Sequence, residues 1–337
     1  MSFQRLLARL DAWLTKLEVA VCLSALAALI VSLTLWVALK GLGARTSDSN
    51  QAGLVFRALI GAILFGAVAR RLTRRNSIAI VAMLAGLEIS WLWRGAGLEW
   101  AGNMLGWLQD GSAFTLLGGL RGFGTRLTLI LALTGGALAT GAGRHVTVDV
   151  IARGMPERSR RPIALIGALL ASVVCFTSAW GFADYIAVDV FRAPIAKSAI
   201  SRLGLMATGI GRHAFLLRRQ IALDARMVGP VLVGRPWDRS LTGEEWNRWL
   251  DSGDWRARYS EEQVAALRDT EGGTRGPLIV APGEAPRGLL AKSFNLIVPL
   301  GLFWLGLRFL LWCLRGAPVD EPVRSEAASE AAGAAPS

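Results

Sequence analysis

The sequence has little cysteine, histidine and lysine. Its 337 residues include three cysteines, two histidines and four lysines. The cysteines, Cys22, Cys175 and Cys313, each lie inside an apolar run, and no two have the spacing of a metal-binding or redox pair. The sequence also has no HExxH, CxxC, P-loop or nucleophile-elbow motif. We therefore predict no catalytic residue, no metal and no cofactor.

Acidic residues are outnumbered, and the excess of positive charge is almost all arginine. Lysine and arginine total 37 against 25 aspartates and glutamates, which gives a net charge of +12. Such a balance can indicate nucleic-acid binding, but the chain has no basic aromatic module of the kind that reads nucleic acid. The arginines flank apolar runs, and this position favours contact with lipid headgroups and control of membrane topology.

Long hydrophobic runs dominate the rest of the chain. Hydrophobic residues make up 53% of the sequence, and the mean hydropathy is +0.43, which is high for a soluble domain. A helix needs about 20 residues to cross the hydrocarbon core of a bilayer. We therefore predict an all-α integral membrane protein with about six transmembrane helices. The predicted spans cover residues 17–39, 53–69, 77–93, 127–142, 163–188 and 289–314. The first run is too long for a signal peptide, so we expect it to be retained.

The positive residues between the runs predict the orientation. With a cytoplasmic N-terminus, twelve basic residues fall in short cytoplasmic segments and five in short outer loops. Cytoplasmic loops of membrane proteins carry the excess of lysine and arginine. Both termini are therefore predicted to be cytoplasmic.

Residues 189–288 differ in character from the runs around them. They are mixed, charged and tryptophan-containing, and we expect them to form short helices and irregular structure in the periplasm. Thr242 with Glu245, and Ser260 with Gln263, have capping-box spacing. Gly272 is a candidate helix stop after the second box, and residues 276–288 read as an extended linker.

The segment RLTLILALTGGALATGAGRHVTVDVIARGMPERSRR, residues 126–161, resembles the DctQ-type small membrane subunit of tripartite ATP-independent periplasmic (TRAP) transporters. The run NLIVPLGLFWLGLRFLL resembles the last helix of that family. The matching positions are Arg126, Gly136, Ala137, His145, Val148, Asp149, Met155, Pro156, Arg160, Pro299, Gly301 and Arg308.

This resemblance implies a fold and a set of partners. The family usually has four spans, so residues 53–93 would be an inserted hairpin. A large DctM-type permease would carry out sodium-coupled uptake of an organic acid delivered by a periplasmic DctP-type binding protein. The small subunit would brace the permease in the bacterial inner membrane, in contact with lipids, and would transport nothing alone.

The resemblance and the predicted spans together divide the chain into seven segments. These are a cytoplasmic N-terminus (1–16), the first span with the inserted hairpin (17–93), an interfacial loop or helix with Trp100 and Trp107 at headgroup depth (94–126), the family-like helix pair (127–188), the periplasmic insertion (189–288), the last span (289–314) and a disordered cytoplasmic tail (315–337).

Several polar residues are candidates for a subunit interface or a loop clamp. His145 and Asp149 either fasten the cytoplasmic turn or form an ordinary solvated turn. Glu88, inside a predicted span, either faces protein or lies near the outer interface. Arg308, and likewise Arg57, is expected to extend to the membrane edge. The candidates are Arg126, Gly136, His145, Asp149, Pro156, Glu88, Pro299 and Arg308.

Two rival functions remain open. A membrane-embedded enzyme would need a cluster of ionisable residues at one depth, and the spans offer Glu88 and Arg308 and little else. A membrane scaffold would present the periplasmic insertion to a partner. Deletion of residues 195–285 separates a scaffold from a TRAP subunit.

Overall fold

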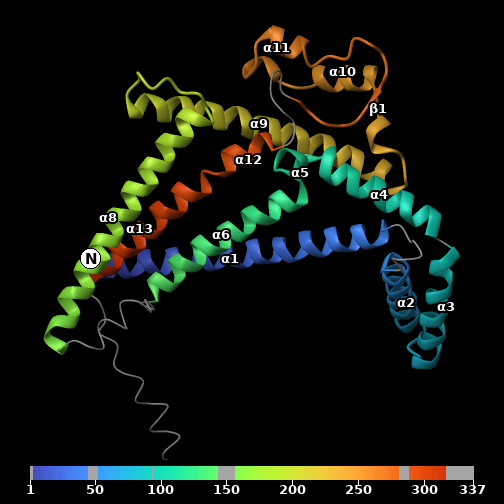
Figure 1. Ribbon diagram of the computed structural model, residues 1–337, viewed down its shortest axis with the longest axis horizontal. Coiled ribbons are helices and arrows are strands. Elements are labelled where there is room, and N and C mark those ends of the chain that lie inside the picture. Colours follow the sequence, from blue (N-terminus) through green and yellow to red (C-terminus); the bar gives the residue numbers. More distant parts are fainter. Residues whose placement is uncertain (1–2, 45–51, 93, 143–155, 281–287, 316–337) are drawn as a thin grey trace, which may run out of the picture. The chain divides into compact units, whose positions relative to one another are not determined.

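The computed structural model describes residues 3–44, 52–92, 94–142, 156–280 and 288–315, and it is α-helical over most of them (Figure 1). The long helices are α1 (Phe3–Leu42), α2 (Ala52–Thr73), α3 (Asn76–Leu92), α4 (Arg94–Asp110), α6 (Gly119–Gly141), α8 (Glu157–Asp189), α9 (Ala199–Leu232) and α13 (Ile297–Arg315). The short elements are α5 (Ala113–Leu116), a 3-10 turn η1 (Trp237–Arg239), β1 (Leu241–Thr242), α10 (Gly243–Asp251), η2 (Trp255–Ala257), α11 (Glu261–Ala265), β2 (Thr274–Arg275) and α12 (Leu289–Phe294).

Five of the described helices are long and apolar enough to cross a membrane. They cover Gln4–Leu42, Gly53–Thr73, Gly119–Gly141, Pro162–Asp189 and Ile297–Arg315. The prediction of an all-α membrane protein is confirmed. The remaining predicted span, residues 77–93, corresponds to α3, which is apolar but is not among these five. Its crossing of the membrane stays a prediction.

The chain divides into two compact units, and the long helices α1, α6 and α8 each contribute to both. Unit 1 comprises Met1–Ala25, Leu129–Ala183 and Ile297–Ser337. Its described residues are parts of α1, α6 and α8 and all of α13. α1 begins at Phe3, so no break separates the predicted N-terminal segment from the first span. Leu7 and Leu14 of α1 pack on Leu311 of α13, which explains why the helix continues through this segment.

Unit 2 comprises Leu26–Thr128 and Asp184–Leu296. Within it α2 and α3 form a helical hairpin (Figure 1), with Arg74 in a left-handed turn between them. A Cβ atom on Gly86 would lie 2.5 Å from the Gly61 carbonyl oxygen, so the two helix backbones approach closely. The sequence-predicted hairpin therefore exists as a structural element.

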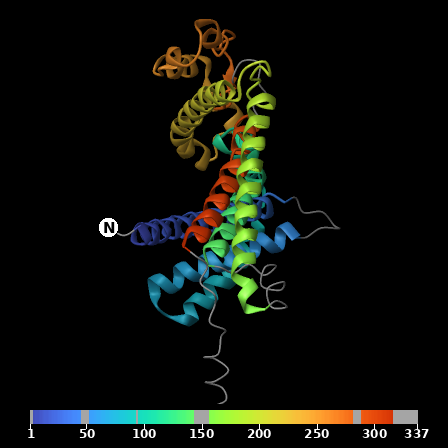
Figure 2. The same cartoon turned by 90° about the vertical axis from the view of Figure 1, so that its left-hand side faces the viewer.

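The segment after α8 contains a long helix that the sequence analysis missed. Short helices were expected throughout residues 189–288, but α9 alone has 34 residues. It begins at the N-cap Ser198, and its buried face packs under a small folded region (Figures 1 and 2). GIGRHA, a nucleotide-binding look-alike, lies inside this helix and is preceded by no strand.

The small folded region consists of α10, α11, the two 3-10 turns and an antiparallel pair of two-residue strands. Leu241 pairs with Arg275, and Thr242 with Thr274. Both predicted capping boxes are present, at Thr242 and at Ser260. The second helix, however, ends at Ala265, before Gly272, whose positive φ belongs to a later turn.

An aromatic core lies between the small folded region, α9 and α12 of unit 2. The fully buried Trp246 and Trp255 pack with Leu216 and Leu223 of α9 and with Leu290 of α12. Trp107 is buried in a second cluster with residues of α1, α6 and α9, because its apolar ring completes that core. Its expected position at headgroup depth stays a prediction.

Candidate functional site

A buried, extensively hydrogen-bonded polar site of unit 1 lies between α1 and α13. Asp11, Thr15 and Glu18 recur every three or four residues, so they share one face of α1. Arg308 and Arg315 are seven residues apart on α13 and share a face in the same way. The two carboxylates balance the two guanidinium groups. We call these five residues, with Trp304, the Arg308 cluster.

The guanidinium of Arg308 bonds to three residues of α1. Its Nε donates to Glu18 Oε1 at 2.6 Å and its Nη1 to Asp11 Oδ1 at 2.6 Å. Its Nη2 donates to Thr15 Oγ1 at 2.9 Å and to the second oxygen of Glu18. All three nitrogens of the guanidinium therefore have partners on one helix face.

Trp304 and Arg315 complete the cluster. Trp304 Nε1 donates to Glu18 Oε1 at 2.6 Å, and Arg315 bonds to the second oxygen of Asp11. The side chains of Arg308 and Glu18 are each 1% exposed, and that of Asp11 is 19% exposed. The expectation that Arg308 extends to the membrane edge is wrong, because α1 brings two carboxylates to the position where α13 holds it.

This cluster was missed in the sequence because its partners are almost 300 residues apart. One signal was available: the Asp11, Thr15, Glu18 spacing on a helix otherwise rich in leucine and alanine. A buried charge is tolerated only when it is paired and hydrogen-bonded. Removal of either partner from such a pair typically costs about 3–5 kcal/mol.

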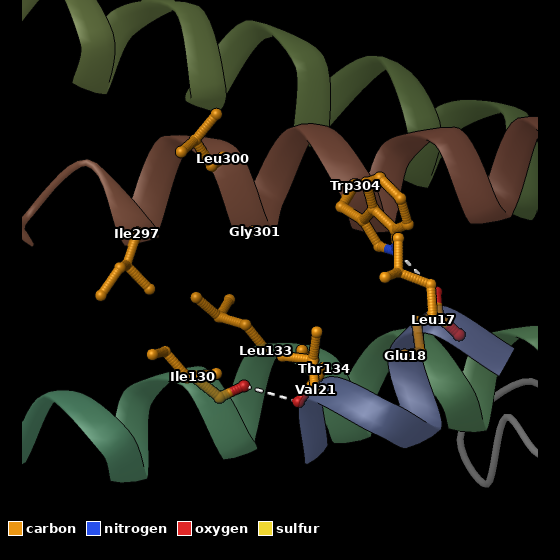
Figure 3. A pocket seen from close by; sticks show the side chains of 10 residues that line it. All are labelled: Leu17, Glu18, Val21, Ile130, Leu133, Thr134, Ile297, Leu300, Gly301 and Trp304. Atoms are coloured by element: carbon orange, nitrogen blue, oxygen red, sulfur yellow. Dashed lines mark hydrogen bonds between the residues drawn. The ribbon is translucent and has the colours of Figure 1, made fainter. Parts of the chain in front are cut away.

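An apolar cavity of about 240 Å³ adjoins the cluster (Figure 3). Glu18 and Trp304 lie at one end of it, joined by their hydrogen bond. The other walls come from α1, α6 and α13. They are formed by Leu17, Val21, Ile130, Leu133, Thr134, Ile297, Leu300 and Gly301. Thr134 donates to the Ile130 carbonyl oxygen at 2.7 Å, so the hydroxyl is satisfied within its own helix.

Small residues let α13 approach its neighbours. A Cβ on Gly301 would lie 2.5 Å from a Leu133 methyl group of α6, and one on Gly306 would lie 3.1 Å from Cys175 of α8. Ser172 of α8 donates to the Gly306 carbonyl oxygen at 2.9 Å. Pro299 is buried in the first turn of α13, where a proline does not break the helix.

Two further candidates lie on α6. Arg126, in unit 2, donates to the carbonyl oxygens of Leu117 and Gly122 at 3.1 and 2.6 Å and so ties the start of α6 to the turn before it. Gly136, in unit 1, has nothing within 4 Å of the position of a Cβ, so its lack of a side chain serves no close contact among the described residues.

The remaining candidates are not assembled into one site. Glu88 is exposed on α3, so its expected position against protein or near the outer interface stays a prediction. Arg57 is buried and donates to the carbonyl oxygens of Leu42 and Ala44 at the end of α1, and its expected position at the membrane edge stays a prediction. Pro156 is exposed just before α8. His145 and Asp149 lie outside the described residues. The second histidine, His213, is half-buried and hydrogen-bonded to Ser293.

A separate polar group in unit 2 links three segments. Gln220 is fully buried; it donates to the Pro277 carbonyl oxygen and accepts from Ile279 N. It also donates to Asp224, which accepts from Ala113 N at 2.7 Å. Burial raises the pKa of the Asp224 carboxyl to about 6, although these two hydrogen bonds oppose the rise. This group fixes α5 and the segment around residue 278 on α9.

These features define an integral membrane protein in which the polar groups around Arg308 bind one another, and those around Gln220 bind one another and the backbone. Residues 115–201, which cover all of α6 and α8, match the family model of the DctQ component of tripartite ATP-independent periplasmic transporters. No curated protein and no solved structure matches the chain.

This part of the chain, about a quarter of its length, is therefore similar to the small permease subunit of TRAP transporters. DctQ is a family of transporter components that work with DctM and DctP partners in general, and the spanning helices fit a multi-pass protein of the bacterial inner membrane. The family match includes Arg126, Gly136 and Pro156 but ends before Pro299 and Arg308.

Proposed function

We propose that this chain braces a large DctM-type permease and takes no part in the chemistry or the conduction of transport. The observation that carries the proposal is the Arg308 cluster within unit 1. Its carboxylates, guanidinium groups, hydroxyl and indole bond to one another. Such a cluster fixes the helices and leaves no charged group of its own for a substrate or an ion.

The outer faces of unit 1 support a bracing role. Leu170 and Val174 on α8 and Leu300 on α13 are more than 60% exposed. In a bilayer, such faces contact lipid or the apolar surface of a partner subunit. A rigid interior with apolar outer faces suits a subunit that supports a moving neighbour.

The finer assignments follow from the family and belong to this proposal. The assembled transporter would take up an organic acid, commonly a carboxylate, with sodium, after delivery by a DctP-type binding protein. Both termini would lie in the cytoplasm, and the segment after α8 would lie in the periplasm. His145 and Asp149 would clamp the cytoplasmic turn against the permease.

Photo-crosslinking during co-purification tests the bracing role. A photoreactive residue is placed at Leu170 or Val174 in the full chain, which is co-expressed with the large permease subunit of its TRAP system and purified in mild detergent. We expect co-elution and a crosslinked species with the combined mass of both chains. The same positions without the permease serve as the control. Elution of the chain alone would overturn the proposal.

Cysteine labelling tests the orientation. Cys22, Cys175 and Cys313 are first replaced, and a single cysteine is then introduced at Pro156 or at Glu262, both of which are exposed. A membrane-impermeant reagent applied to the periplasmic side should label the Glu262 site and leave the Pro156 site unlabelled until the membrane is opened. The reverse pattern would overturn the orientation and leave the bracing role intact.

The packed aromatic core of unit 2 favours a second candidate function, that of a scaffold presenting this region to another protein. Deletion of residues 195–285 discriminates between the two. A bracing subunit should still co-purify with the permease after the deletion. A scaffold should lose its function entirely.

A further inference from the structure

α9 has two different apolar faces. One face is buried in unit 2 and consists of residues spaced by three or four positions. They are Leu216, Gln220, Leu223, Met227 and Val231. Leu216 and Leu223 pack in the aromatic core with the small folded region, and Met227 and Val231 pack in the second cluster with residues of α1, α4 and α6. This packing leaves the opposite side of α9 to be explained.

The opposite side carries apolar residues that this chain leaves exposed. Ile200, Ile221, Val228 and Leu232 are 79%, 53%, 40% and 49% exposed. The last three are seven and four residues apart, so they form one stripe along the helix. Exposed alanines at 214 and 225 continue it. A water-facing helix normally carries polar residues at these positions.

The exposed charged side chains of α9 are all arginines. Arg212, Arg218 and Arg226 are exposed, and no hydrogen bond or ion pair joins them to other described residues. The one acidic residue of the helix, Asp224, points inward to Ala113 N. Arg219 donates to the Trp249 carbonyl oxygen and stacks over that ring. The exposed surface therefore presents cations beside an apolar stripe.

The start of α9 is fixed at the end of a membrane-spanning helix. α8 ends at Asp189, and α9 begins at Ala199. Arg202 donates to both carboxylate oxygens of Asp184, each at 2.8 Å, and its Nη1 also binds the carbonyl oxygens of Ile195 and Lys197. This bidentate pair holds the first turn of α9 at the level where α8 leaves the hydrocarbon.

We propose that α9 lies in the headgroup layer of the bilayer, with its apolar stripe at the acyl boundary and its exposed arginines bound to the phosphates of anionic phospholipids. An amphipathic helix with apolar residues on one side and arginines beside them has the composition of an interfacial helix. Its length, about 50 Å at 1.5 Å per residue, would carry the small folded region laterally along the membrane surface.

Local quenching of a fluorophore by spin-labelled lipids tests this placement. In full-length chain without its native cysteines, a single cysteine at Ile221 or Val228 carries an environment-sensitive fluorophore, and Glu262 on α11 provides the matched exposed control. The chain is placed in nanodiscs with phosphatidylcholine that bears a nitroxide near the headgroup. We expect strong quenching at both stripe positions and little at Glu262.

A charge variant tests the lipid class. The nitroxide is attached to phosphatidylglycerol or to phosphatidylcholine, and quenching at Val228 is compared. We expect stronger quenching by the anionic lipid than by phosphatidylcholine. This preference should fall by about fivefold for each of Arg212, Arg218 and Arg226 that is changed to glutamine, with no loss of helicity. Arg239→Gln, an exposed arginine of η1 outside the helix, should leave the preference unchanged.

Three outcomes would contradict the proposal. Weak quenching at Ile221 and Val228, equal to that at Glu262, would show that the stripe does not face lipid. Quenching that disappears when the large permease is added would identify the stripe as a protein interface. Equal quenching by the two lipids would refute the anionic preference. None of these results depends on the transport role of the chain.

Discussion

The Arg308 cluster of unit 1 and the aromatic core of unit 2 differ in chemistry. Unit 1 buries the charged Arg308 and Glu18 and exposes large apolar side chains such as Val174. Unit 2 buries Trp246 and Trp255 within its aromatic core. A unit in lipid gains nothing from hiding leucine from its surroundings, so close packing and polar contacts must hold it together. A region in water can rely on apolar burial.

The largest expected effect is the loss of the buried charge pair of unit 1. Arg308→Met leaves Glu18 buried without its main partner, and we expect a loss of about 3–5 kcal/mol in the stability of the purified protein. Thermal unfolding in detergent measures it. The double variant Arg308→Met with Glu18→Met should recover most of this loss, because no uncompensated charge remains. An equal loss in both variants would contradict a charge-based account.

Trp246→Ala makes the corresponding test in unit 2. It removes a fully buried indole that also donates to the Leu267 carbonyl oxygen at 2.7 Å. We expect a loss of about 3–5 kcal/mol, seen as faster proteolysis within residues 241–275. Trp180, which is 52% exposed on α8, is the matched control. A similar loss for Trp180→Ala would show that the two environments do not differ.

Gly301→Ala tests the close packing of unit 1. The added methyl group would meet the Leu133 side chain of α6 at 2.5 Å, so one helix must move. We expect a cost of about 1–3 kcal/mol in thermal unfolding. Gly136→Ala, which meets nothing within 4 Å, should be neutral or slightly stabilising. Identical effects of the two substitutions would argue against close packing at Gly301.

The smallest expected effect concerns pH and unit 2. The pKa of Asp224 rises from 3.8 to about 6 on folding, so between these values the folded state binds more protons than the unfolded state. Its contribution to stability therefore falls as pH rises through this window, by about 1 kcal/mol once partial solvent screening is allowed for. Asp224→Asn should remove this slope from hydrogen exchange around α5. An unchanged slope would assign it to another group.

Local features of this fold could be predicted from the sequence. The apolar runs predicted the five helices that are long enough to span a membrane. The capping boxes at Thr242 and Ser260 could be predicted because each involves a residue only three positions away. α9 was missed because its apolar residues serve two faces. The glycines, alanines and arginines that separate these apolar residues obscure the 3.6-residue period that one apolar face would show.

The candidate site could be predicted only in part. Arg308 was identified, but its role was not, because its partners Asp11 and Glu18 come from the other end of the chain. No local pattern specifies which distant helix a buried arginine will meet. Pro299 was identified through the family pattern, and the structure gives it a buried place in the first turn of α13.

The central claim is that this chain supports transport without carrying it out. The most direct test reconstitutes the large permease and the binding protein of its TRAP system into proteoliposomes, with and without this chain, and measures uptake of the substrate under a sodium gradient. The account predicts uptake only when this chain is present and none by this chain alone. Equal uptake without it, or uptake by it in isolation, would contradict the account.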